Sequence, residues 1–276
     1  AVVIAAGRDK RRAQVLVRRA RGTVNPADAD ATSSQVNASG AFPFFTPEPS
    51  PAFLAVGYII GPKYGARLGE AGINTTDALL EACASPKGRK DMARWICRTG
   101  RYRPMIESEL DRAGLPRELF YLAMIESGMN PRAVSSVQAV GPWQFMAGTA
   151  KDYDLRQNWW FDERRDFEMS TRAAARYLKN LYRRFGDWAL VLAAYNTGGG
   201  RIAHKIRLHG HDNFWKMRLP SQTTDFVPKF IAAARIGENP EKYGFQDRQV
   251  RPLQYEVVPV DDATDLDLIA RCAGLV

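Results

Sequence analysis

The sequence has 276 residues, of which 45% are hydrophobic and 11% aromatic, so the chain can bury a sizeable core and is not disordered throughout. Its net charge of +9 is unevenly spread, because residues 1–22 hold seven basic side chains and one acid. Such a basic segment favours an anionic neighbour: a nucleic acid, a membrane surface or the bacterial envelope. A solvated tail without a partner is the alternative. No run of about 18 apolar residues predicts a membrane-spanning helix.

The first half of the chain divides into three predicted parts. We expect a basic helix over residues 1–22. Residues 23–52 contain repeated prolines, which disfavour both helix and sheet, so residues 1–53 are interpreted as a basic tail and a Pro-rich linker. Residues 54–100 have apolar spacing and Gly/Pro breaks that indicate a small helical unit.

The second half is predicted to be helical. Residues 101–245 show apolar residues at helical spacing between short Gly/Pro breaks, and no convincing alternating strand. Pro116 suits the first position of one of these helices. Residues 246–276 form a C-terminal extension in which 247–260 is expected to be extended. The fold class is therefore mainly α.

Cysteine and histidine give no evidence of a metal site. The three cysteines are Cys83, Cys97 and Cys272. They are far apart and form no CxxC pair, so free buried thiols are expected. The three histidines are His204, His209 and His211, interpreted as surface residues because no carboxylate or cysteine completes a ligand set. We expect no metal and no cofactor.

The segment from Leu119 to Gly128 is the most informative one. Glu126 ends an apolar helix, Gly128 then breaks that helix, and Pro131 prevents its return. Apolar surroundings and the negative end of the helix dipole both disfavour the carboxylate. Both effects raise the pKa, as a general acid working near neutral pH requires. A Glu at an ordinary exposed helix end is the competing interpretation.

Two later segments have residues suited to sugar binding. In Gly141-Pro142-Trp143-Gln144-Phe145-Met146, the aromatics offer flat apolar faces and the glutamine offers a donor and an acceptor. In the segment from Ala193 to Gly200, a buried helix runs into Tyr195 and Asn196 and then a glycine cluster. A loop that only caps the core is the alternative for the first of them.

These three segments, in this order, resemble the lytic transglycosylase family of bacterial cell-wall enzymes, most closely the membrane-bound type D branch. The resemblance covers roughly residues 101–245 and implies a goose-lysozyme-like catalytic domain. It implies that Glu126 protonates the glycosidic oxygen between MurNAc and GlcNAc. The same residue then takes a proton from the muramyl 6-hydroxyl group, which closes a 1,6-anhydro ring. This chemistry also explains why we find no second carboxylate, which most glycosidases need.

The resemblance also implies a substrate-binding site and a cellular location. The candidate substrate-binding residues are Ser127, Gln144, Phe145, Met146, Tyr195, Asn196 and Phe226. The expected partner is the peptidoglycan glycan strand, and the expected location is the bacterial cell envelope or periplasm. One departure is clear: family members carry a carboxylate and a phenol where this chain has Gln222 and Phe226.

Three other functions stay open at this point. A hydrolase of the same fold would use a carboxylate such as Asp152 or Asp166 to activate water. A catalytically impaired peptidoglycan-binding protein is compatible with the changes at Gln222 and Phe226. The third is nucleic-acid binding by the N-terminal region. Residues 54–100 are similar to helix-hairpin-helix domains, which hold DNA phosphates, although Ile59 replaces a hairpin glycine.

Overall fold

The computed structural model describes residues 3–6, 13–17, 86–245 and 256–260, and single residues at 250, 252, 265, 268 and 271. The chain divides into two compact units, one formed by Ala1–Thr46 with Leu253–Val276 and the other by Pro47–Pro252. The small helical unit predicted at 54–100 lies outside the described residues up to position 85, and so does its hairpin motif.

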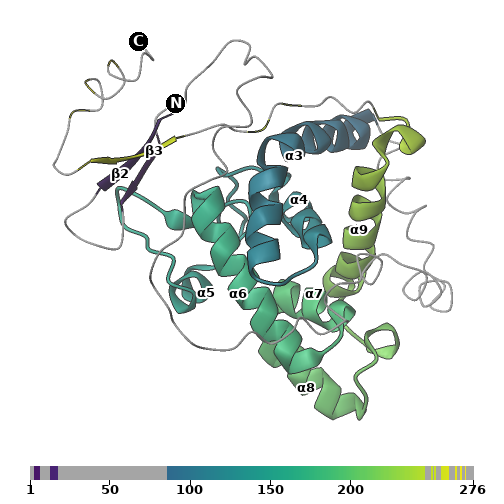
Figure 1. Cartoon of the computed structure of the whole chain (residues 1–276). Helices are drawn as coiled ribbons and strands as arrows, with labels where there is room; N and C mark the ends of the chain where they lie inside the picture. Colours follow the sequence, from purple (N-terminus) through teal and green to yellow (C-terminus); the bar gives the residue numbers. More distant parts are fainter. Residues whose placement is uncertain are drawn as a thin grey trace. The chain divides into compact units, whose positions relative to one another are not determined.

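The first unit contains a three-stranded antiparallel sheet (Figure 1). Strand β1 (Val3–Ala6) pairs with β2 (Ala13–Val17), and β2 pairs with β3 (Glu256–Val260). The basic helix predicted for residues 1–22 is therefore wrong. Both strands contain valine, which favours strands, and the pairing of β2 with residues about 240 positions away cannot be read from local spacing. The extended segment expected around 247–260 is confirmed for β3.

The second unit is helical, which confirms the mainly α prediction. Its α-helices are α3 (Pro86–Arg112), α4 (Phe120–Ser127), α5 (Ala147–Asp152), α6 (Phe167–Phe185), α7 (Trp188–Thr197), α8 (Gly199–His209) and α9 (Ser221–Glu238). Short 3-10 helices are η3 (Arg117–Leu119), η4 (Glu163–Arg165), η5 (Phe214–Lys216) and η6 (Pro240–Tyr243). In the part of the chain that is described, no helix has the length and apolar character needed to cross a bilayer.

Helix α3 runs without interruption through position 100, where we placed a domain boundary. Pro104 lies inside this helix. The helix packs on α4 and α6 and its buried face adds Ile106 and Leu110 to the core. The N-terminal part of α3 is therefore continuous with the helical body that carries the candidate site.

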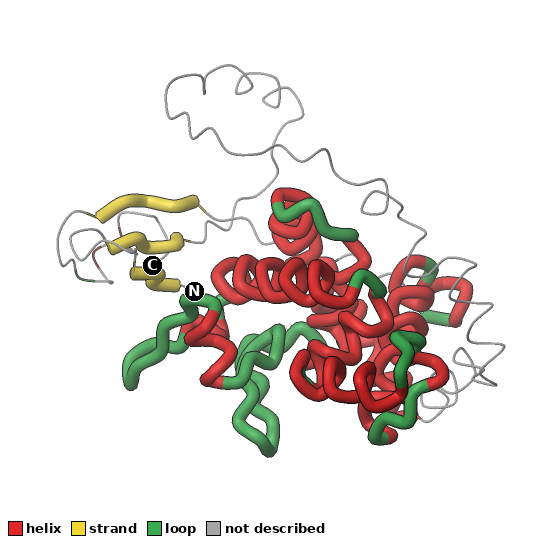
Figure 2. The backbone as a smooth tube through the Cα atoms, turned by 90° about the horizontal axis from the view of Figure 1, so that it is seen from below, coloured by secondary structure: helices red, strands yellow, loops and turns green. Residues whose placement is uncertain are grey.

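Two apolar helices form the centre of this body. Helix α7 is buried from Trp188 to Ala194 and contacts α6, α8 and α9. Helix α4 is buried from Phe120 to Met124 and contacts α3 and α9. Figure 2 shows the helices of this body packed against one another. Both central helices carry candidate site residues near their C-terminal ends, so the core fixes the positions of those residues.

Side chains and glycines mark the helix ends. Asp187 caps α7, since its Oδ1 accepts from the backbone N–H groups of Ala189 and Leu190 at 2.9 and 3.2 Å. Gly128 ends α4 and Gly186 ends α6, each in the left-handed conformation. The predicted stop of the Glu126 helix at Gly128 is thus confirmed.

Candidate active site

Glu126 lies in the last turn of α4, one residue before the helix ends at Ser127. The N–H of Gly128 donates to the carbonyl of Met124 at 2.8 Å and closes the helix. A side chain at Gly128 would be unfavourable twice: its φ is +61°, and an added Cβ would lie 2.2 Å from Trp95 Nε1. The glycine therefore lets the chain leave the helix directly beside the acid.

The Glu126 carboxyl has an apolar environment. Burial raises its pKa from the ordinary 4.5 to about 8, and no cation among the residues that the structure describes opposes this shift. The residue as a whole is half-buried, so the side chain keeps some contact with solvent. Glu126 lies close enough to Tyr195 to help raise the pKa of that phenol. A protonated carboxylic acid reachable from outside is what a general acid requires.

Ser127 connects the end of α4 to the Gly141–Met146 loop. Its hydroxyl donates to the carbonyl of Pro142 at 2.9 Å and accepts from the N–H of Asn130 at 3.1 Å. The hydroxyl also lies 3.2 Å from the carbonyl of Ala123. The structure thus uses this side chain to hold two segments of the site together.

The Gly141–Met146 loop depends on unusual backbone angles. Gly141 has φ +85°, and a Cβ there would lie 1.8 Å from the carbonyl oxygen of Arg164. Gln144 also has a positive φ, of 50°, which is costly for a residue with a side chain. Its Nε2 donates to the carbonyl of Gly141 at 2.8 Å. Since a carbonyl oxygen holds the amide nitrogen, the amide oxygen of Gln144 is left to accept from a ligand.

Trp143 joins the loop to the core and to Tyr195. Its indole ring is fully buried, and its Nε1 donates to Thr171 Oγ1 at 2.9 Å. Its carbonyl accepts from Tyr195 Oη at 2.7 Å. Tyr195 also packs on Tyr177, with ring centroids 5.3 Å apart. Burial first, and then the nearby Glu126 and Tyr177, raise the pKa of Tyr195 well above its ordinary range. Tyr195 is therefore a neutral phenol beside the acid.

Asn196 is held by a residue that the sequence did not single out. Thr223, buried in α9, donates through Oγ1 to Asn196 Oδ1 at 3.2 Å. With its oxygen engaged, Asn196 has its amide nitrogen available to donate. Thr223 lies between Gln222 and Phe226, the two residues that differ from the family pattern, but the sequence analysis assigned it no role.

The remaining substrate-binding candidates differ in exposure. Met146 is 45% exposed, so a ligand can reach it. Phe145 is only 2% exposed and Phe226 only 8%, and both belong to the hydrophobic core. The expectation that these two rings contact a sugar is corrected for this reason. Phe145 contributes through its backbone instead, because its carbonyl accepts from Arg164 Nη1 at 3.3 Å.

The two carboxylates considered for a hydrolase have other positions. Asp166 caps α6, where its Oδ1 accepts from the N–H of Met169 at 2.7 Å, and burial raises its pKa. Asp152 is exposed at the end of α5. Among the described residues, no hydrogen bond or ion pair joins either carboxylate to Glu126.

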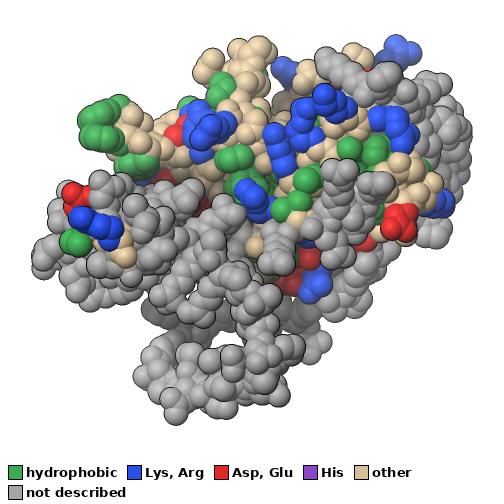
Figure 3. Space-filling model, turned by 90° about the horizontal axis from the view of Figure 1, so that it is seen from above, with side chains coloured by type: hydrophobic (Ala, Val, Ile, Leu, Met, Phe, Trp, Pro, Cys, Tyr) green, Lys and Arg blue, Asp and Glu red, His purple; other side chains and the backbone are tan. Residues whose placement is uncertain are grey.

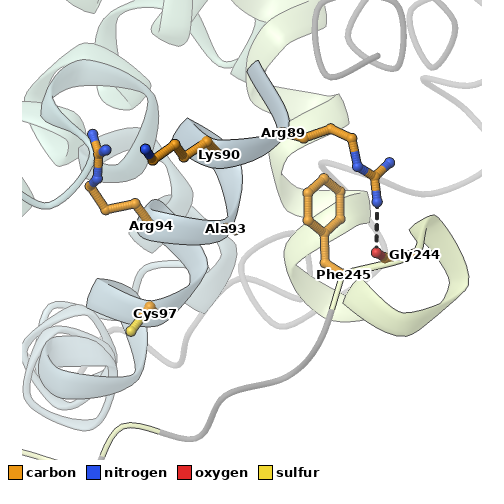
Figure 4. Close-up of a pocket in the computed structure, with 7 residues that line it drawn as sticks. All are labelled: Arg89, Lys90, Ala93, Arg94, Cys97, Gly244 and Phe245. Carbon is orange, nitrogen blue, oxygen red and sulfur yellow. Dashed lines mark hydrogen bonds between the residues drawn. The ribbon is translucent and has the colours of Figure 1, made fainter. Parts of the chain in front are cut away.

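In the described part of the chain, α3 borders two cavities that are not lined by Glu126. One, of about 500 Å³, lies between α3 and the two residues that follow η6, where Arg89 donates to the carbonyl of Gly244 at 2.7 Å. Lys90 and Arg94 also line this cavity, and Figure 4 shows both side chains pointing away from Phe245. The second, of about 370 Å³, includes Arg101. These basic cavities are distinct from the candidate active site.

A known protein family matches the part of the chain that carries this site. Residues 103–218 match the family described as "Transglycosylase SLT domain". The match contains the Glu126 helix, the Gly141–Met146 loop and the Tyr195–Asn196 segment. The resemblance to lytic transglycosylases inferred from these three segments is confirmed for this part of the chain.

Two relatives each match part of the chain. The chain is 36% identical over 148 residues to membrane-bound lytic murein transglycosylase D of Escherichia coli, covering 52% of this chain and 33% of that protein. It is 39% identical over 102 residues to a putative tributyltin chloride resistance protein of an Alteromonas species, covering 37% of this chain and 49% of that protein. The chain thus spans half or less of the length of these relatives.

A solved structure gives a further comparison. An inactive mutant of the lytic transglycosylase Slt from Pseudomonas aeruginosa matches with a TM-score of 0.41 and 21% identity. That match covers 53% of this chain and 25% of the other.

Proposed function

We propose that residues 101–245 form a lytic transglycosylase domain that cleaves the β-1,4 bond between MurNAc and GlcNAc in peptidoglycan. The observation that carries this proposal is Glu126, a carboxylic acid with a pKa near 8 beside Tyr195, within the matched transglycosylase domain. The murein named for the Escherichia coli relative gives the substrate class. The same relation supports action in the bacterial cell envelope.

A single residue serves both proton transfers in this mechanism. Protonated Glu126 gives its proton to the glycosidic oxygen as the bond to the muramyl carbon breaks. The resulting carboxylate takes the proton of the 6-hydroxyl group of the same muramyl residue, whose oxygen closes the 1,6-anhydro ring. Glu126 is thereby protonated again, and water is not consumed. A pKa near the working pH suits a group that must act first as acid and then as base.

The neighbouring polar groups suit recognition of an N-acetyl sugar. The amide nitrogen of Asn196 and the amide oxygen of Gln144 are the groups left available after their internal hydrogen bonds are made. One donor and one acceptor match the carbonyl and N–H of an acetamido group. Ser127 supports the site by holding the loop to the helix end, and Met146 offers an exposed apolar contact.

Digestion of purified sacculi tests this proposal. Wild-type protein is expected to release muropeptides with 1,6-anhydro ends, identified by mass spectrometry. Glu126→Gln is expected to release none while still binding sacculi. Glu241→Gln is the matched control, because Glu241 is exposed on η6 and the substitution is chemically the same.

The other outcomes separate the competing functions. Muropeptides with reducing ends would identify a hydrolase. Binding without release by the wild type would identify a peptidoglycan-binding protein. Equal release by the wild type and Glu126→Gln would refute the role of Glu126.

A further inference from the structure

Exposed apolar side chains gather in the loops between α4 and α6. Of the large hydrophobic residues that are exposed in the described part of the chain, most fall between positions 134 and 161. The two most exposed are Trp159 at 82% and Trp160 at 75%. Figure 2 shows loops, in green, extending from the helical body, and Figure 3 shows one group of hydrophobic side chains at an edge of the described surface and others spread over it. Exposed tryptophan pairs are uncommon, since each ring leaves a large apolar area in water.

The two tryptophans sit on a well-braced turn. Asn158 Oδ1 accepts from the N–H groups of Trp160 and Phe161 at 2.8 and 2.9 Å, and the N–H of Asn158 donates to the carbonyl of Phe161 at 2.8 Å. A bridge between Gln157 and Asp162 closes the base of the turn. The two indole rings lie 4.1 Å apart with 33° between their planes. The turn therefore presents two adjoining flat faces with little freedom to fold them away.

Further contacts connect this turn to the candidate active site. Asp162, at the base of the turn, forms an ion pair with Arg164 at 2.7 Å. Arg164 Nη1 then donates to the carbonyl of Phe145, which lies between Gln144 and Met146. The turn and the Gly141–Met146 loop are thus connected through the buried side chain of Arg164.

The charges around the turn are balanced. Arg156 pairs with Glu163 at 2.5 Å, and Asp162 pairs with Arg164. The exposed acids nearby include Asp152 and Asp154. An anionic membrane surface attracts an excess of basic residues, which this turn lacks. A sugar ring, neutral and with an apolar face, fits two exposed indoles without such an excess.

We propose that Trp159 and Trp160 form a platform on which sugar rings of a glycan strand stack, beyond the bond that is cleaved. This inference rests on the proposed function and adds a second contact for polymeric peptidoglycan. The platform makes the domain favour long or insoluble glycan over short fragments, because only a long strand reaches both the platform and Glu126.

The test uses the double variant Trp159→Ala/Trp160→Ala. On sacculi we expect KM to rise about tenfold or more, which corresponds to losing about 1.4 kcal/mol of stacking, while kcat stays near the wild-type value. On a soluble tetrasaccharide we expect kcat/KM to change less than about twofold. Trp159→Phe/Trp160→Phe should restore most of the affinity for sacculi because it keeps two aromatic faces.

The control is Leu208→Ala, which removes an exposed apolar side chain, 64% exposed, from α8. It should leave KM on sacculi unchanged. Because all of these side chains are on the surface, the variants should keep the wild-type melting temperature. If the double tryptophan variant loses kcat/KM equally on sacculi and on the tetrasaccharide, or on neither, the proposed role of Trp159 and Trp160 is refuted.

Binding without turnover separates this inference from the proposed function. In the Glu126→Gln background, the tryptophan substitutions should reduce co-sedimentation with sacculi about tenfold. Unchanged co-sedimentation would overturn the platform even if the wild type proves to be a lytic transglycosylase. If the tryptophan substitutions reduce binding to phosphatidylglycerol vesicles and leave binding to sacculi unchanged, the two tryptophans bind a membrane surface and not a glycan. If the wild type releases no anhydro product, the proposed function is refuted. The co-sedimentation experiment then still decides whether Trp159 and Trp160 bind glycan.

Discussion

Replacing Glu126 by glutamine should stabilise the protein while removing its activity. The Glu126 carboxyl has a pKa of about 8 in the folded chain and about 4.5 when unfolded. Between these values the folded state binds more protons than the unfolded state. Stability therefore falls as pH rises from 4.5 to 8, and this loss disappears when glutamine, which does not titrate, takes the place of Glu126.

The size of the effect follows from the same two values. At pH 7 the unfolded carboxyl is ionised, and keeping it protonated in the fold costs up to about 3 kcal/mol, at 1.36 kcal/mol for each pH unit above 4.5. Because part of the side chain contacts solvent, we expect a measured gain of about 1–3 kcal/mol for Glu126→Gln at pH 7. Near pH 4.5 the gain should fall below about 0.5 kcal/mol.

Denaturation by urea, followed by circular dichroism, measures this difference. The free energy of unfolding of wild type and Glu126→Gln is compared at half-unit steps from pH 4.5 to 9, with Glu241→Gln as the control. The difference should grow with pH and level off above about pH 8. A difference that stays constant across this range would show that Glu126 ionises normally, and the reasoning about its burial would be refuted.

The other predictions concern catalysis and the loop. First, kcat/KM on sacculi should fall as pH rises through about 8, because the protonated form of Glu126 starts the reaction; a pH–rate profile that is flat from 6 to 9 would contradict this. Second, Thr223→Val should lower kcat/KM about fivefold to tenfold through loss of the hydrogen bond to Asn196, and Thr223→Ser should restore it; equal activity of both variants would argue against this contact. Third, Gly141→Ala should lower the free energy of unfolding by more than about 2 kcal/mol, whereas Gly148→Ala, with open space and an ordinary φ, should have little effect.

Much of the structure of residues 101–245 could be predicted from local sequence. The helix that ends at Gly128, the loop that begins at Gly141 and the acid at Glu126 all follow from apolar runs broken by glycine or proline. The raised pKa of Glu126 also follows, because an ionisable group that continues an apolar helix is buried with it.

The contacts that depend on distant parts of the chain could not be predicted in this way. Thr223 holds Asn196 only because α9 packs on α7. We predicted that the ring of Phe145 contacts a sugar. In the structure this side chain is buried in the core, whereas the side chain of the next residue, Met146, is exposed. Strand β2 forms through pairing with residues 256–260, which local spacing at residues 13–17 does not reveal.

The fate of solvent oxygen during cleavage tests the central claim most directly. Sacculi are digested by the wild type in water enriched in heavy oxygen, and the released muropeptides are weighed by mass spectrometry. If Glu126 drives ring closure by the sugar's own 6-hydroxyl group, the new ends will carry no heavy oxygen and will be lighter than hydrolysed ends by one water. Incorporation of heavy oxygen at the new ends would show that water is the nucleophile and would contradict the account.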